Sequence, residues 1–174
     1  PKTSGNVNFF NPEKEIMESI DNIDDDSLKI FRRNIQMIFQ DPYESLNPRW
    51  TIKDIIKEPL DIHNIGNLTE REDTILEILR TVGLTPPENY LSRYPHEISG
   101  GQRQRVSIAR TLVMKPKFVI CDEPTSMLDV SIRISIMDLM LNLAKELDVS
   151  YLNITHDLAV ARYMCDRIAV MFKG

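Results

Sequence analysis

The sequence contains FVICDEP at residues 118–124, a run of four apolar residues that ends in two carboxylates and a proline. A continuous apolar run of this length is typical of a strand buried on both faces, as in a parallel sheet. Ligands of open parallel sheets bind outside the carboxyl ends of the strands. Asp122 and Glu123 occupy that position, where an aspartate can hold Mg²⁺ and a second carboxylate can orient or deprotonate a water molecule. Taken alone, the stretch fits a polar strand end that begins a turn equally well.

Helices and strands alternate around this run. Apolar runs predict strands over 35–39, 151–155 and 168–171. Apolar residues at helical spacing predict helices over 100–114, 131–147 and 158–164. This alternation implies right-handed crossovers and a mostly parallel sheet, so the predicted fold class is α/β.

Residues 51–98 differ in character, because their apolar residues recur at helical spacing without an intervening strand. Gly83 is a plausible stop signal there, with two prolines shortly after it. We therefore predict a small helical subdomain over about 51–98, inserted in a single domain that spans 1–174. Towards the N-terminus, the first ten residues, which end in VNFF, predict a short strand, and residues 28–33 predict a helix. The Asp-Pro and Asn-Pro pairs within 41–48 predict a loop.

A second motif is ISGGQ at residues 98–102. A serine precedes two glycines at the start of a predicted helix. Glycine lets the backbone approach a ligand closely, and a helix N-terminus presents free N–H groups to an anion. An ordinary capped helix with a glycine turn is the simpler interpretation of the same residues.

The composition is that of an ordinary globular protein. The chain has 174 residues, of which 42% are hydrophobic and 27% charged, with a formal net charge of −5. This mildly acidic balance gives no reason to expect a nucleic acid as partner. No apolar run approaches the length of a membrane span. The two cysteines, Cys121 and Cys165, are expected to be reduced thiols of a cytosolic protein, with Cys121 buried and inert.

Together these segments resemble the ABC ATPase family, which has a P-loop NTPase fold. The resemblance rests on five motifs in family order: FQDP at 39–42 (Q-loop), ISGGQ at 98–102 (signature), FVICDE at 118–123 (Walker B), SMLD at 126–129 (D-loop) and THD at 155–157 (switch histidine). The chain departs from the usual pattern in having isoleucine at the start of the signature and methionine in the D-loop.

The resemblance extends to one branch of this family. Five longer stretches are similar to the branch that imports oligopeptides, dipeptides or nickel: 39–49, 93–97, 129–132, 156–160 and 166–171. This implies an ATP-hydrolysing subunit that energises peptide uptake from the cytoplasmic face of the membrane. Its implied partners are transmembrane permease subunits, a second ABC ATPase domain and, indirectly, a solute-binding protein.

The resemblance also implies roles for individual residues toward ATP and Mg²⁺. Asp122 would help to hold the metal, and Glu123 would be the general base. His156 would contact the γ-phosphate and the attacking water. Gln40 would sense both Mg²⁺ and the γ-phosphate.

Other implied roles concern a head-to-tail dimer of two such domains. Ser99, Gly100 and Gly101 would contact ATP held by the partner domain, with Gln102 completing the signature. Asp129 would cross the interface. The predicted helical subdomain would face the membrane subunits.

The sequence contains no G-x-x-x-x-G-K-[ST] loop, which cradles phosphates with backbone N–H groups and a lysine. By resemblance this loop belongs upstream of the first residues, so we expect the N-terminal part of the core to be missing. The strands at 118–121 and 152–154 should then have uncovered apolar flanks. We expect a chain of this kind to be inactive alone and to be unstable or self-associating.

Two other functions fit the same residues. A non-catalytic module could supply signature and D-loop contacts to an intact ATPase domain. A non-transport ABC ATPase, from DNA repair or translation, is the second alternative. Repair members of the family need long coiled-coil arms, whereas residues 41–97 between Gln40 and the signature show no sustained heptads.

Overall fold

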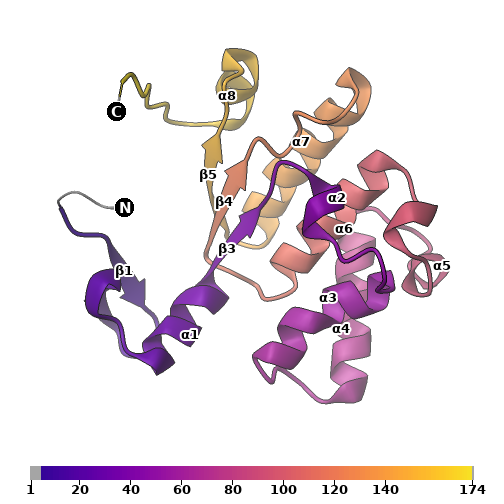
Figure 1. The fold of residues 1–174 in the computed structure, drawn as a ribbon, viewed down its shortest axis with the longest axis horizontal. Helices are drawn as coiled ribbons and strands as arrows, with labels where there is room; N and C mark the ends of the chain where they lie inside the picture. Colours follow the sequence, from indigo (N-terminus) through magenta and orange to yellow (C-terminus); the bar gives the residue numbers. More distant parts are fainter. Residues whose placement is uncertain (1–4, 174) are drawn as a thin grey trace.

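The structure, a computed structural model, describes residues 5–173 and is built on a three-stranded parallel sheet (Figure 1). Its strands are β3 (Ile35–Ile38), β4 (Phe118–Asp122) and β5 (Ser150–Ile154), in the order β3-β4-β5. The register aligns Ile38 with Cys121 and Cys121 with Asn153. Figure 1 shows the three arrows pointing the same way, so their carboxyl ends form one edge. The predicted α/β class and the three strands are confirmed.

The three helices predicted around these strands are present: α6 (Gly100–Leu112) precedes β4, α7 (Val130–Glu146) lies between β4 and β5, and α8 (Leu158–Met164) follows β5. Ile38, Val119 and Cys121 are completely buried, and they share one apolar core with residues of all three helices. The predicted burial of Cys121 is confirmed, and burial raises the pKa of its thiol to about 12, which disfavours the reactive thiolate.

The opposite face of the sheet is open. The register aligns Met37, Ile120 and Leu152 in one row across the three strands. Leu152 and Ile154 on the edge strand are each 49% exposed, and Met37 and Ile120 are half-buried. The predicted uncovered apolar flank is therefore present, most clearly on β5.

Residues 51–98 are helical, as predicted. They form α3 (Ile52–Ile62), α4 (Leu68–Thr81), α5 (Glu88–Leu91) and the short 3₁₀ helix η2 (Pro95–Glu97). Gly83 has φ +77° just after α4, which makes it the predicted stop. The buried apolar faces of α3 and α4 belong to the same core as β4. The division into a separate subdomain stays a prediction.

The N-terminal part forms a hairpin that stands beside α1. The antiparallel strands are β1 (Asn8–Asn11) and β2 (Ile16–Ser19), followed by the 3₁₀ helix η1 (Ile20–Asn22) and by α1 (Asp25–Asn34). The predicted helix is confirmed, and the predicted strand is confirmed over residues 8–10, while its first four residues lie outside the described residues. The strand β2 was not predicted, because its residues, IMES, show no apolar run. Pairing with β1 stabilises this short strand.

Two predictions are wrong. The predicted loop over 41–48 contains the short helix α2 (Pro42–Ser45), because Asp41 caps it and a proline suits the first helical position.

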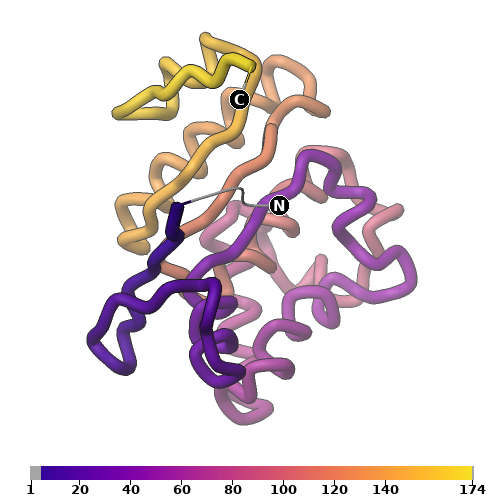
Figure 2. The backbone as a smooth tube through the Cα atoms, turned by 60° about the vertical axis from the view of Figure 1, so that its left-hand side comes forward, coloured from indigo at the N-terminus to yellow at the C-terminus, as the bar shows by residue number. Residues whose placement is uncertain are grey.

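The predicted strand over 168–171 is irregular, and Val170 and Met171 are 84% and 83% exposed. Figure 2 shows this segment (yellow) running apart from the three strands. A strand needs a partner, and among residues 5–173 no strand pairs with these residues.

Candidate functional site

The carboxyl edge of the sheet brings three predicted site residues together. Gln40 follows β3 by two residues, Glu123 follows β4 directly, and His156 follows β5 by two residues. Because the strands are parallel and in register, side chains that leave their carboxyl ends converge at one place. The candidate site therefore lies at this edge.

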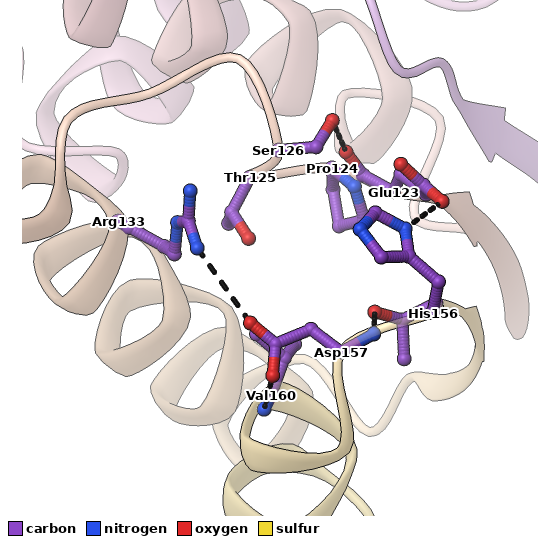
Figure 3. A pocket seen from close by; sticks show the side chains of 9 residues that line it. Glu123, Pro124, Thr125, Ser126, Arg133, His156, Asp157 and Val160 are labelled. Atoms are coloured by element: carbon purple, nitrogen blue, oxygen red, sulfur yellow. Dashed lines mark hydrogen bonds and ion pairs between the residues drawn. The ribbon is translucent and has the colours of Figure 1, made fainter.

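Glu123 is the centre of the group. Gln40 donates a hydrogen bond from Nε2 to Glu123 Oε2 at 3.3 Å. The Nδ1 atom of His156 lies 2.5 Å from Glu123 Oε1 (Figure 3). Both carboxylate oxygens thus have a neighbour from a different strand end, which fixes the direction of the side chain.

The backbone of Glu123 is held in an unusual conformation. Its φ is +44°, in the left-handed region that residues with a side chain seldom adopt. Its N–H donates to the carbonyl of Ile154 at 3.0 Å, and its own carbonyl accepts from the N–H and the hydroxyl of Ser126. Such strain persists only where the surroundings impose it, and it is concentrated at functional sites.

A cavity of about 100 Å³ lies beside Glu123. Its lining comprises Glu123, Pro124, Thr125, Ser126, Arg133, Thr155, His156, Asp157 and Val160 (Figure 3). Arg133 reaches from α7 to within 3.7 Å of the carboxylate of Asp157. The cavity thus presents a carboxylate, an imidazole and a cation to a small polar ligand.

Sequence reasoning did not assign Arg133, Thr125 or Asp157 to the site. Asp157 carries a readable signal, since an aspartate between a strand and a helix is typical of a cap, and its Oδ1 accepts from the N–H of Ala159 at 2.8 Å. Arg133 carries none, because the spacing of apolar residues along α7 does not say which polar side chain turns toward the sheet edge.

Asp122, the predicted metal ligand, is the last residue of β4 and is half-buried. Among residues 5–173 no cluster of three or more histidine, cysteine or acidic side chains could hold a metal ion. Mg²⁺ typically keeps several waters and takes one or two protein carboxylates besides the phosphates of its substrate. Asp122 and the amide oxygen of Gln40 are the oxygen donors that the sequence offers for it.

The signature residues lie outside the cavity. Ser99 caps α6 together with Gln102: the N–H of Ser99 donates to Gln102 Oε1 at 2.9 Å, and the N–H of Gln102 donates to Ser99 Oγ at 3.3 Å. Ser99 is exposed, Gly100 half-buried and Gly101 buried. The capped-helix interpretation is thus confirmed, while the role toward ATP stays a prediction.

Gly101 has a packing role of its own. A Cβ atom there would lie 2.7 Å from Cγ2 of Ile132 on α7, whereas one at Gly100 would meet no atom closer than 3.8 Å. Only the second glycine is therefore required by the approach of α7 to α6. Asp129, the predicted interface residue, is exposed at the start of α7 and its side chain does not cap that helix.

The contact with Glu123 raises the pKa of His156 above its usual 6.5, mainly through the hydrogen bond. The imidazolium is stabilised in the folded state, so this stabilisation is complete below about pH 6.5 and disappears as the pH rises through the raised pKa.

We expect an NMR titration of the His156 ring to show a pKa above that of a free histidine, and we expect Glu123→Gln to lower this pKa towards the free value. Glu146→Gln, at an exposed carboxylate on α7, is the control. An unchanged titration in Glu123→Gln would mean that the two side chains do not interact in solution.

Comparison with curated proteins gives similar sequences among peptide transport components. The chain is 49% identical over 158 residues to the oligopeptide transport ATP-binding protein AppF of Bacillus subtilis, covering 90% of this chain and 47% of that protein. It is 54% identical over 145 residues to the oligopeptide transport ATP-binding protein OppF of the same organism, and the match covers 83% of this chain and 47% of OppF. It is 46% identical over 170 residues to the dipeptide transport ATP-binding protein DppF of Lactococcus lactis, and the match covers 96% of this chain and 54% of DppF. The chain thus spans about half the length of these relatives.

Solved structures agree in fold. A dimeric post-hydrolysis state of the ATP-binding cassette MJ0796, bound to ADP and Pi, superimposes with a TM-score of 0.74 at 33% identity, covering 93% of this chain and 67% of that one. This confirms the predicted P-loop NTPase type of α/β fold. The ABC transporter family matches residues 2–126, which include the strand end that carries Glu123. The chain belongs to the ABC transporter family.

Proposed function

We propose that this chain is part of the ATP-hydrolysing subunit of an importer that takes up oligopeptides or dipeptides. The observation that carries the proposal is the placement of Glu123 at the carboxyl end of β4, with Gln40 and His156 on its two oxygens. The peptide branch is supported by the names of the relatives that are about half identical to the chain.

In this function Glu123 is the general base. It accepts a proton from the water that attacks the γ-phosphate, and its carboxylate is already aimed by contacts from two other strand ends. His156 holds the attacked phosphate and the water in line. Mg²⁺, when bound, neutralises charge on the phosphates, and Asp122 and Gln40 would hold it together with water.

The proposed partners are a second ATPase domain and the permease subunits. The exposure of Ser99 and Asp129 supports a role at an interface between two such domains, and the similar solved cassette is a dimer. No helix among the described residues is long and apolar enough to cross a membrane. We infer that attachment to the cytoplasmic face of the membrane occurs through the permease, which in turn meets a solute-binding protein.

The test uses the intact subunit encoded by the gene, together with its permease. We expect Mg²⁺-dependent ATP turnover and uptake of a labelled oligopeptide that stops when the subunit is deleted. ATP turnover without peptide uptake would reject the peptide assignment only. The absence of ATP turnover in the assembled transporter would reject the enzymatic function itself.

A further inference from the structure

Arg103 is a buried cation next to the signature residues. It lies in the first turn of α6, and only 8% of its surface is exposed. Its Nη1 atom donates to the carbonyl of Pro95 at 3.1 Å and to that of Ile98 at 2.5 Å. The side chain thus folds back on the chain that leads into Ser99 and holds two of its carbonyls.

The same guanidinium also contacts the loop that follows Gln40. Its central carbon lies 3.8 Å from the centroid of the Tyr43 ring, a close cation–π contact. Tyr43 is in α2, and its N–H donates to Asp41 Oδ1 at 2.7 Å. Asp41 follows Gln40 directly, so Tyr43 is fixed to the segment that reaches the Glu123 carboxylate.

No carboxylate among residues 5–173 forms an ion pair with Arg103, and its Nε has no hydrogen-bond partner there. The charge is therefore balanced by two carbonyl dipoles and one aromatic face, all three from segments 40–45 and 95–98. A planar guanidinium can stack on a ring and donate in its plane at the same time, whereas the ammonium of lysine cannot.

We propose that Arg103 is a positioning residue that couples the Gln40 segment to the signature segment of the same chain. A shift of Gln40 moves Tyr43, and the stacked guanidinium transmits the shift to the carbonyls of Pro95 and Ile98. Under the proposed function, on which this inference rests, Gln40 serves one ATP site and Ser99 serves the site of the partner domain. Arg103 then links the state of one site to the geometry of the other.

The test compares Tyr43→Leu with Tyr43→Phe in the intact subunit. Tyr43 is 59% exposed, so both variants are expected to fold, and only the phenylalanine keeps a ring face. We expect the amides of residues 98–102 to exchange hydrogen about tenfold faster in Tyr43→Leu and as in the wild type in Tyr43→Phe. The kcat for ATP should fall by a similar factor in Tyr43→Leu, with the KM unchanged. Equal exchange in the two variants would overturn the proposal.

Arg103→Lys supplies the second half of a double-mutant cycle. Because both changes break one contact, we expect the exchange rates of Tyr43→Leu/Arg103→Lys to match those of Arg103→Lys alone. Additive effects would show that the two residues act separately, which also overturns the coupling. Hydrogen exchange needs no turnover, so a subunit that does not hydrolyse ATP would reject the proposed function while the exchange data still decide whether Tyr43 and Arg103 are linked.

Discussion

Glu123→Gln in the intact subunit is expected to lower the kcat for ATP hydrolysis by about 10²- to 10⁴-fold. The amide keeps the size of the side chain, but it lacks the charge that stabilises protonated His156 and, in the proposed function, cannot accept the proton of the attacking water. ATP binding should persist, because in the proposed function Glu123 acts on the water rather than on the nucleotide. Phosphate release and nucleotide binding, measured on the same preparation, separate the two effects.

Glu146→Gln is the matched control, since it makes the same chemical change at an exposed carboxylate of α7 away from the cavity. It should leave kcat unchanged. If Glu123→Gln turns over ATP at the rate of the wild type, the general base is another group, and the contacts made by Gln40 and His156 serve only to hold the turn after β4.

Gly101→Ala is expected to lower the free energy of unfolding by about 1–3 kcal/mol, the usual cost of overpacking a well-packed core. The added methyl group would lie 2.7 Å from Cγ2 of Ile132, so α6 and α7 must separate. Gly100→Ala, one residue earlier, places its methyl group 3.8 Å from the nearest atom and should be neutral or slightly stabilising. Urea unfolding of both variants of the intact subunit measures the difference.

A second change tests the cause. Ile132→Ala removes the atom that clashes, so it should destabilise the Gly101→Ala variant less than it destabilises the wild type. If Gly101→Ala and Gly100→Ala unfold alike, the close approach of the two helices is not what requires glycine at position 101.

The sequence predicted best what is local. The strand at 118–122, the helix that begins within ISGGQ and the stop at Gly83 depend on apolar runs, caps and glycine, and each was placed within a few residues. The strand predicted at 168–171 failed because an apolar run states only that a strand can form, whereas pairing depends on a neighbour. The hairpin strand β2 was missed for the opposite reason, since it pairs with β1 although its residues show no apolar run.

The site shows the same division. Parallel strands deliver Gln40, Glu123 and His156 to one edge, so their meeting follows from the alternation of helices and strands together with the family resemblance. Arg133 lines the cavity because the orientation of α7 turns this side chain toward the sheet edge. Gly101 is required for packing because α6 and α7 approach each other closely. Neither feature can be predicted from the spacing of residues along the chain, because both depend on distances between elements that are remote in sequence.

The left-handed backbone at Glu123 has a thermodynamic consequence for the protein as a whole. A residue with a side chain at φ +44° costs about 1–2 kcal/mol relative to a relaxed conformation, and glycine there would be almost free of this penalty. Glu123→Gly would relieve this cost, but it would also remove the contacts with Gln40 and His156 and the carboxylate on which the proposed function depends. The left-handed backbone thus places a cost in stability at the residue on which the proposed function depends most.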